Sequence, residues 1–455
     1  MTLPRYSALR RAALKAVATT VAGAALTACG GGPFGMFESS KDKKKLQGTR
    51  ISVLALERDL RPSVESVDTQ VILPRPEDSV NWPQSGGLSH HAMQHMIIAE
   101  NPRLAWRANI GVGSGKRNRD LAAPIVGGGR VFTVDGKGRV CAFDAKSGRR
   151  LWSVVTPPKR ERDGAFLGGG IAFEEDRLFV TGGFAEILAL NATNGKVLWR
   201  TSFESPIHSA PTVLGGRVFA VTVDNQAVAV AAINGKVLWT YSGASNQTIL
   251  LGGPAPAVDG GVAVTAFTSG EIAALRVDTG ASLWSDNVIS VRRTEAAANM
   301  PDVAGNPVID RGRVYAVGHS GILVAIDLRT GQRVWDAPIA GICEPWIAGD
   351  FLFSLTLDAE LACIDVRSGH IVWVTQIQRY KNEKDKKGPI VWSGPGLASD
   401  RLIVVGSNGE ALSISPYTGE VLSRLKLAAP ATLPPVFADK TMYLINDDGQ
   451  LAAYR

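Results

Sequence analysis

A segment of fixed length recurs eight times along the last three-quarters of this chain, and this repeat leaves very few folds open. Seven copies carry a proline twenty residues before the end of a short apolar run, and the eighth has Ile171 at that position. The prolines are Pro124, Pro211, Pro256, Pro307, Pro345, Pro395 and Pro435. A glycine follows most runs by four residues, and in six copies a tryptophan follows that glycine by another four. Repeats of roughly 40 to 50 residues with four strand-like pieces are typical of a β-propeller.

Each copy divides into four short extended pieces separated by turn residues. In the copy that starts at Pro307, alternating apolar residues surround turns at residues 311–312, 320–321 and 329–331. Glycine supplies the positive φ that tight hairpins need, and proline is tolerated at the first position of a strand. The pattern therefore predicts an all-β, eight-bladed β-propeller in which every blade has four antiparallel strands, A to D.

The ends of the repeat region predict how the ring closes. The last copy ends at Arg455 after its third strand, whereas Arg103–Arg107 has the features of a D strand, including Trp106, with no A, B or C strand before it. Pairing this N-terminal strand with the last blade ties both ends into one ring and removes exposed edges. Residues 101–455 are therefore expected to form one propeller domain. The tryptophan on each D strand is expected to pack between neighbouring blades.

The amino terminus has the pattern of an export signal. Four basic side chains within residues 1–15 precede an uncharged stretch over residues 16–28, which is too short to cross a bilayer as a helix. Leu26–Cys29 resembles the lipobox of bacterial lipoproteins, which implies a signal peptide at residues 1–28 and lipidation of Cys29. An ordinary cleavage site beside a chance cysteine is the alternative.

The segment between the lipobox and the repeats divides in two. Residues 29–48 are rich in Gly, Ser and Lys and are predicted to form a flexible tether. Residues 49–100 contain a strand candidate at residues 51–56 and shorter extended pieces, and we expect them to pack on the propeller.

Charge says little about the function, and the basic runs do not favour a nucleic-acid partner. The formal net charge is +7, but residues 1–28 carry four positive and no negative side chains, so 7 − 4 = +3 remains after processing. The basic runs Lys41–Lys45 and Lys381–Lys387 lack the interleaved aromatic residues of a nucleic-acid groove. The first run could lie near anionic head groups or belong to a solvated tether.

Cysteine and histidine usage predicts neither a disulfide nor a metal site. Cys141, Cys343 and Cys363 remain besides Cys29. The expected strand positions place Cys343 and Cys363 roughly 9 to 10 Å apart, too far for a disulfide. The histidines of residues 90–95 lack further ligands nearby, so a metal there is the less favoured interpretation.

The chain resembles the BamB family of outer-membrane assembly lipoproteins. The resemblance rests on the lipobox, on Trp82–Gly87 (Trp-Pro-Gln-Ser-Gly-Gly) and on repeats of the Asp-x-x-x-Gly-x-x-x-Trp type, and it covers nearly the whole chain. It implies a non-enzymatic scaffold without a cofactor, lipid-anchored at the periplasmic face of the outer membrane. The implied partners are the periplasmic domains of BamA, other subunits of the β-barrel assembly machinery and unfolded outer-membrane proteins, whose insertion the family assists.

The connections from one blade to the next are the candidate binding surface. Proline-to-tryptophan spacing within a copy is 28 residues, whereas the gap from a tryptophan to the next proline varies from 10 to 23. Variable loops on a rigid scaffold usually carry binding residues.

By resemblance, the BamA contacts of the family correspond to residues 246–254 and 300–307. Leu250 matches the second of two family leucines, but Leu251 stands where the family has a basic residue. Asp302 matches one of two family aspartates. We expect Leu250, Leu251 and Asp302 to be exposed on neighbouring blades and to bind a partner. The alternative is that the leucines lead into an A strand and are buried.

Two other functions stay open for this type of repeat. Quinoprotein alcohol dehydrogenases share it, but that family uses adjacent cysteines, a glutamate and an asparagine on calcium, and an aspartate base. The chain has no adjacent cysteines, and we recognise no matching carboxylate set. A periplasmic propeller that binds sugars or peptidoglycan fragments is the other alternative, and an aromatic-lined concavity would favour it.

Overall fold

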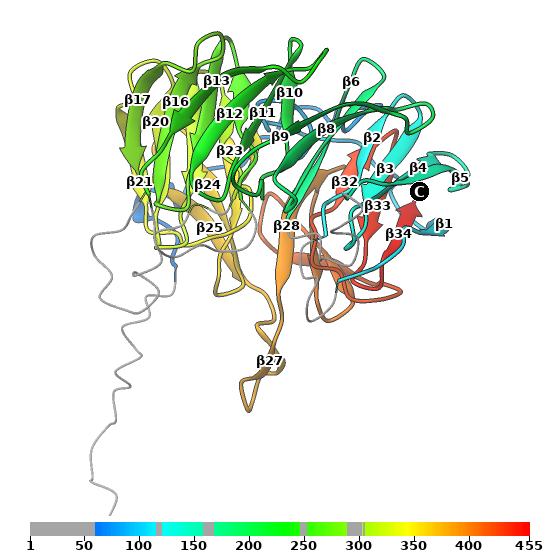
Figure 1. Ribbon diagram of the computed structural model, residues 1–455. Coiled ribbons are helices and arrows are strands. Elements are labelled where there is room, and N and C mark those ends of the chain that lie inside the picture. The colour runs from blue at the N-terminus through cyan, green and yellow to red at the C-terminus, as the bar shows by residue number, and fades with distance from the viewer. Residues whose placement is uncertain (1–59, 115–120, 158–167, 246–252, 289–302, 304) are drawn as a thin grey trace, which may run out of the picture. The chain divides into compact units, whose positions relative to one another are not determined.

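The computed structural model describes residues 60–114, 121–157, 168–245, 253–288, 303 and 305–455. All of them belong to one compact unit, Leu60–Arg455. This part of the chain contains eight four-stranded antiparallel sheets and one two-stranded sheet, and Figure 1 shows the eight larger sheets arranged around a ring. The predicted all-β, eight-bladed propeller is therefore confirmed.

The first four blades follow one another along the chain. Blade 1 contains β2 Ile125–Gly127, β3 Arg130–Val134, β4 Arg139–Asp144 and β5 Arg150–Val155. Blade 2 contains β6 Gly169–Glu174, β7 Arg177–Gly182, β8 Glu186–Asn191 and β9 Val197–Ser202. Blade 3 contains β10 Thr212–Leu214, β11 Arg217–Val221, β12 Gln226–Ala231 and β13 Val237–Ser242. Blade 4 contains β14 Ala257–Asp259, β15 Val262–Ala266, β16 Glu271–Arg276 and β17 Ser282–Asn287.

The remaining blades continue in the same order, with one insertion. Blade 5 contains β18 Val308–Asp310, β19 Arg313–Val317, β20 Leu323–Asp327 and β21 Arg333–Ala337. Blade 6 contains β22 Trp346–Ala348, β23 Phe351–Leu355, β24 Glu360–Asp365 and β25 Ile371–Gln376. The inserted hairpin consists of β26 Tyr380–Asn382 and β27 Lys387–Pro389. Blade 7 contains β28 Trp392–Ala398, β29 Arg401–Gly406, β30 Glu410–Ile414 and β31 Val421–Lys426.

The eighth blade is assembled from both ends of the described chain. It contains β32 Val436–Ala438, β33 Thr441–Ile445 and β34 Gln450–Tyr454, and its fourth strand is β1 Leu104–Asn109. The β1 strand runs antiparallel to β34, with Trp106 opposite Ala453 and Asn109 opposite Gln450. The backbone groups of Arg103 and Arg455 exchange two hydrogen bonds of 2.7 and 2.9 Å. The predicted closure by an N-terminal strand is confirmed.

Tryptophan and glycine interlock neighbouring blades, as the repeat predicts. Seven D-strand tryptophans lie against the C–D turn glycine of the next blade, where an added Cβ would lie under 3.0 Å from side-chain atoms. The pairs are Trp106–Gly148, Trp152–Gly195, Trp199–Gly235, Trp239–Gly280, Trp284–Gly331, Trp335–Gly369 and Trp373–Gly419. Each indole N–H also donates to a backbone carbonyl just beyond the C strand of that next blade, at 2.7 to 3.2 Å. Glycine is needed there because a side chain would displace the ring.

One local prediction of strand starts is wrong. Proline was expected to begin each A strand, and six prolines do stand immediately before an A strand. Pro395 instead lies inside β28, where the pairing with β29 shifts register between Ser393 and Gly396. The irregular register accommodates a residue that cannot donate a ladder hydrogen bond.

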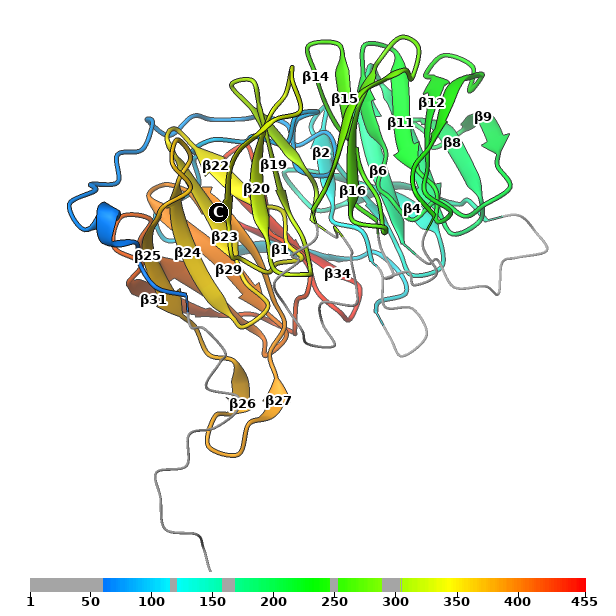
Figure 2. The same ribbon diagram turned by 90° about the vertical axis from the view of Figure 1, so that its left-hand side faces the viewer.

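Strand order defines two faces of the ring. Because neighbouring strands are antiparallel, the A–B and C–D turns lie on one face, and the B–C turns and D–A connections lie on the other. Figure 2 shows the blue segment that precedes β1 crossing the upper side, whereas β26 and β27 hang from the lower side. Residues 60–103 contain a single turn of 3-10 helix, η3 Val64–Ser66. In the described residues, no helix has the length and apolarity to cross a membrane.

Candidate partner-binding face

Residues 79–98, which we call the belt, contact all eight blades in ring order. The carbonyl oxygen of Ser79 accepts a 2.8 Å hydrogen bond from blade 8, and Met96 exchanges backbone hydrogen bonds with blade 7. Each blade contributes a backbone group from its A strand or the A–B turn. These groups belong to Asp439, Val126, Phe173, Val213, Val258, Ile309, Gly349 and Leu397. The belt therefore lies across the centre of the A–B face.

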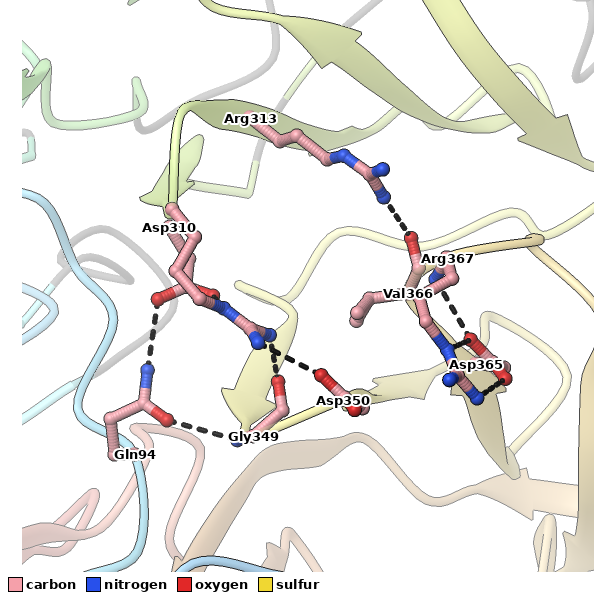
Figure 3. Close-up of polar contacts among 9 residues, drawn as sticks. Gln94, Asp310, Arg313, Gly349, Asp350, Asp365, Val366 and Arg367 are labelled. Atoms are coloured by element: carbon pink, nitrogen blue, oxygen red, sulfur yellow. Dashed lines mark hydrogen bonds and ion pairs between the residues drawn. The ribbon is translucent and has the colours of Figure 1, made fainter. Parts of the chain in front are cut away.

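Aromatic and amide side chains fix the belt in place. The ring of Trp82 stacks on Trp346 with centroids 6.1 Å apart and meets Phe437 edge-on at 6.2 Å. The amide of Gln94 donates to Asp310 at 3.0 Å and accepts from the N–H of Gly349 at 2.9 Å, so one side chain joins blades 5 and 6 (Figure 3). The belt therefore occupies the centre of the A–B face, whereas the connections of variable length lie on the opposite face.

A half-buried polar cluster joins two of the connections between blades. We call it the Asn306 cluster; it consists of Ser85, Ala255, Asn306 and Glu344. The Asn306 oxygen accepts from the N–H of Ala255 at 2.7 Å, and its NH₂ group donates to Glu344 at 2.7 Å and to Ser85 at 3.1 Å. This single amide therefore links the end of the β13–β14 connection, the end of the β17–β18 connection, blade 6 and the belt.

Electrostatics in the Asn306 cluster favour neutral groups. Burial raises the pKa of the Glu344 carboxyl to about 8, although the hydrogen bond from Asn306 opposes the shift. Burial also lowers the pKa of the neighbouring His91 to about 4. Its Nδ1 must donate to the carbonyl oxygen of Pro307, 2.7 Å away, because a carbonyl can only accept. The other nitrogen, Nε2, is buried and has no partner among the described residues.

The predicted site residues lie outside the described residues. This holds for Leu250, Leu251 and Asp302 and for the lipidation site Cys29, so their exposure stays a prediction. The described ends of the two connections are close together, because Ala255 follows the first connection and Asn306 ends the second, and the two are hydrogen-bonded. This link could not be predicted from the repeat, since it joins residues 51 positions apart through one side chain.

The connection between blades 6 and 7 contains structure that the repeat does not predict. Lys381–Lys387 was recognised as a basic loop, but β26 and β27 pair across it, with Tyr380 opposite Pro389 and Asn382 opposite Lys387. The long gap between Trp373 and Pro395 is the one signal that could have indicated an insertion here.

The residues at the ring centre do not fit a calcium and quinone site. The structure brings one glutamate and one asparagine together, Glu344 and Asn306, but the asparagine oxygen is occupied by the Ala255 N–H. The group facing Glu344 is therefore an NH₂ donor, which cannot bind a cation. In the described ranges no three His, Cys, Asp or Glu residues form a possible metal site, and Cys141, Cys343 and Cys363 are free thiols. We derive no catalytic step.

The histidines of the belt have structural partners instead. Both His91 and His95 direct Nδ1 to a backbone carbonyl, of Pro307 and Pro74 respectively. The second nitrogen of His95 accepts a 2.9 Å hydrogen bond from the N–H of Asp400. His95 thus helps to fasten the belt to blade 7.

A small pocket on the D–A face bears on the sugar-binding alternative. It has a volume of about 390 Å³ and is lined mainly by hydroxyl, amide and carboxylate side chains between blades 2 and 3. Its lining residues are Ser202, Phe203, Glu204, Ser205, Thr222, Asp224 and Gln226. A single aromatic side chain does not make an aromatic-lined concavity, so this pocket does not favour sugar binding.

Comparison with known families identifies the repeat. The family model described as "Outer membrane protein assembly factor BamB" matches residues 94–163 and 157–375, which is more than half of the chain. The chain belongs to the BamB family. The resemblance predicted from the lipobox and the repeats is therefore confirmed.

Individual relatives agree with the family assignment. The chain is 27% identical over 358 residues to the outer membrane protein assembly factor BamB of Shewanella oneidensis, covering 77% of this chain and 88% of the relative. It is 25% identical over 352 residues to the protein of the same name from Escherichia coli, covering 76% and 87%.

Solved structures support the fold. BamB from Moraxella catarrhalis has a TM-score of 0.65 at 16% identity, covering 78% of this chain and 99% of that one. A quinohemoprotein alcohol dehydrogenase from Comamonas testosteroni has a TM-score of 0.63 at 13% identity, covering 82% and 80%. The two solved structures are thus nearly equally similar to this propeller, so this likeness shows the fold alone.

Proposed function

We propose that this BamB-family chain is a non-enzymatic scaffold of the outer-membrane β-barrel assembly machinery. In this proposal it is anchored to the periplasmic face of the outer membrane by lipid on Cys29. It binds the periplasmic domains of BamA, and together with other subunits it assists the insertion of unfolded outer-membrane proteins. Relatives named outer membrane protein assembly factors support the general role.

The observation that carries the proposal is the coverage of one face by the belt. Residues 79–98 contact the A strand or A–B turn of every blade, so the centre of that face is already occupied by the chain itself. The D–A connections, which vary most in length, lie on the other face. A partner of a rigid propeller is therefore expected at the D–A connections.

Two of these connections are held at a common point. Asn306 joins the end of the β13–β14 connection, which contains Leu250 and Leu251, to the end of the β17–β18 connection, which contains Asp302. In a modest interface the leucines supply apolar area and the aspartate sets the register against a basic group on BamA. The cluster joins the described ends of both connections, which favours a common binding site for the two.

The test is a double substitution, Leu250→Glu with Asp302→Lys, followed by capture of BamA. The expected result is loss of BamA binding with an unchanged melting temperature. A matched control uses the same two types of change on the same two blades but on the opposite face, Leu214→Glu with Asp259→Lys. Both control residues are exposed at the ends of A strands. Full BamA capture by the first variant, or equal loss in both variants, would remove this site.

A further inference from the structure

A hairpin projects from the D–A face between blades 6 and 7 (Figure 2). Every residue from Lys381 to Pro389 is exposed. Figures 1 and 2 both show β26 and β27 extending away from the ring, and Figure 2 shows that they do so on the side opposite the belt. A projection of this kind meets any flat surface before the rest of that face does.

The base of the hairpin is fixed to the propeller. The indole N–H of Trp392 donates to the carbonyl oxygen of Gln378 at 2.7 Å, and the N–H of the buried Ile390 donates to that of Arg379 at 2.9 Å. The Arg379 guanidinium forms an ion pair with Asp358 at 2.5 Å and lies over the ring of Tyr380, 5.5 Å from its centroid. Packing therefore sets the direction in which the hairpin points.

The carboxylates of the hairpin are occupied locally. Glu383 accepts hydrogen bonds from the backbone N–H groups of Arg379 and Tyr380 at 2.7 and 2.9 Å. Asp385 accepts from the side-chain amide of Asn382 at 3.1 Å. In the described part of the chain, the four lysines of the hairpin take part in no ion pair. They are Lys381, Lys384, Lys386 and Lys387.

The lysines surround the tip rather than forming one face. Lys387 lies opposite Asn382 in the strand register, whereas the stem of Lys381 covers the other side, next to Gly388. Lys384 and Lys386 lie in the turn between the strands. A partner that surrounds or spreads beneath the tip can meet all four charges, whereas a partner on one side cannot.

The chemistry of the tip favours a lipid surface over a protein. Protein interfaces obtain most of their affinity from buried aromatic, Met or Arg side chains, and lysine is depleted from them. Residues 381–389 contain no aromatic and no large apolar side chain. An anionic bilayer needs no such anchor, because it attracts clustered lysines as point charges. We propose that the β26–β27 hairpin binds the anionic head groups of a phospholipid bilayer.

Such a contact would orient the propeller. Residues 29–59 could span up to about 100 Å if fully extended, so lipid on Cys29 alone would leave the propeller free to rotate. The hairpin would turn the D–A face towards the bilayer and the belt away from it. The inference does not depend on BamA binding, and lipid contact by the hairpin is measured without BamA.

The test is co-sedimentation with lipid vesicles. We would use the chain from residue 29 onward with Cys29→Ser, because every described contact lies within Leu60–Arg455 and none needs the signal segment. Lys41, Lys43, Lys44 and Lys45 are replaced by Gln in the parent and in every variant, so that the basic run before the propeller does not bind the vesicles. Vesicles contain phosphatidylcholine alone or mixed with phosphatidylglycerol. The variant replaces Lys381, Lys384, Lys386 and Lys387 by Gln. Since each lysine near an anionic surface contributes roughly fivefold, we expect at least a tenfold loss of binding to the mixed vesicles.

A matched control removes four positive charges from the C–D turns on the opposite face. It replaces Lys146, Lys196, Lys236 and Arg329, all exposed, by Gln. The control and a variant with four Lys→Arg changes in the hairpin should both bind as the parent does. The proposal is overturned if the hairpin variant keeps its binding or if the control loses as much. It is equally overturned if the parent binds neutral vesicles as well as anionic ones, or if the hairpin changes reduce BamA capture but not vesicle binding.

Discussion

The indole N–H of Trp106 donates a hydrogen bond to the carbonyl oxygen of Ala145, 3.2 Å away, and thereby joins the first strand of the propeller to the blade that follows it. The guanidinium of Arg455 donates to the same oxygen at 2.6 Å. The two ends of the described chain thus meet on one acceptor of blade 1. The ring is closed by strand pairing within blade 8 and by this contact to blade 1.

Trp106→Ala should destabilise the whole propeller, since it opens the packing at the point of closure. Trp106 is partly buried against the core, so its loss should cost about 3 kcal/mol, at the lower end for a tryptophan, and urea unfolding measures this value. Trp106→Phe keeps an aromatic ring but removes the indole N–H. This variant should cost about 1 kcal/mol for the lost hydrogen bond, which is less than Trp106→Ala costs. Leu104→Ala in the same strand is the control, because Leu104 is 44% exposed and should cost little. Equal effects at both positions would contradict the closure role.

A side chain at a C–D turn glycine should destabilise the protein for two reasons, the positive φ and the contact with the tryptophan ring. Two glycines allow these two effects to be measured separately. Gly195 and Gly216 have nearly the same φ, +74° and +73°. An added Cβ at Gly195 would lie 2.7 Å from Trp152, whereas at Gly216 nothing lies within 4 Å. Alanine at Gly216 should cost about 1 kcal/mol for the left-handed backbone. Alanine at Gly195 should cost at least about 1 kcal/mol more, because the indole must shift. Chemical denaturation of both variants measures the difference, and equal values would show that the tryptophan yields without cost.

The sequence predicts the strands well because each repeat carries its own local signals. In the copy that starts at Pro307, the predicted turns at residues 311–312, 320–321 and 329–331 all lie between the observed strands β18, β19, β20 and β21. Even the exception in the tryptophan series has a structural reason. Ser423 lies on β31 of blade 7, and the next blade has no C–D turn, since its C and D strands come from opposite ends of the chain. No turn glycine exists there to receive an indole.

Residues 49–100 were expected to pack on the propeller, but the individual contacts of the belt and of the Asn306 cluster could not be predicted, because backbone groups and single side chains from distant positions form them. Ser89 meets Val258, and His90 meets Ile309, through main-chain hydrogen bonds that any residue could make. Glu344 and Asn306 lie on neighbouring blades and become partners only when blades 5 and 6 pack together. Periodicity reports which strand a residue belongs to and gives no information about contacts across the ring.

Lipidation predicts how the chain fractionates. Cys29→Ala should shift the protein from the membrane to the soluble periplasmic fraction, because each buried acyl CH₂ contributes about 0.8 kcal/mol of anchoring. The control is Cys343→Ala, which removes a free thiol of the propeller and should leave the protein in the membrane fraction. If Cys29→Ala also stays in the membrane fraction after a salt wash, the lipobox interpretation is wrong.

The ionisation of Glu344 predicts a pH dependence of stability. Its pKa is raised by burial from 4.5 to about 8 in the folded protein, so the folded state holds a proton that the unfolded state releases. Between these two values the unfolded state binds fewer protons, and stability therefore falls as pH rises, by at most about 1.4 kcal/mol per pH unit. Below pH 4.5 both states are protonated, and above pH 8 both are ionised, so the effect is constant outside that window.

Glu344→Gln removes this penalty while keeping an oxygen that can accept the hydrogen bond from Asn306. The variant should match the parent near pH 4.5 and should be the more stable of the two at pH 8, as measured by urea unfolding at both pH values. Glu420→Gln, at an exposed position in the C–D turn of blade 7, is the control and should leave the pH profile unchanged. If the free energy of unfolding differs between parent and Glu344→Gln by the same amount at both pH values, the pKa of Glu344 is not raised by folding. The carboxyl would then be ionised in the folded state at pH 8. The cluster would then hold a negative charge. The link between the two connections would depend on a hydrogen bond from the Asn306 amide to a charged Glu344 carboxylate instead of a neutral carboxyl group.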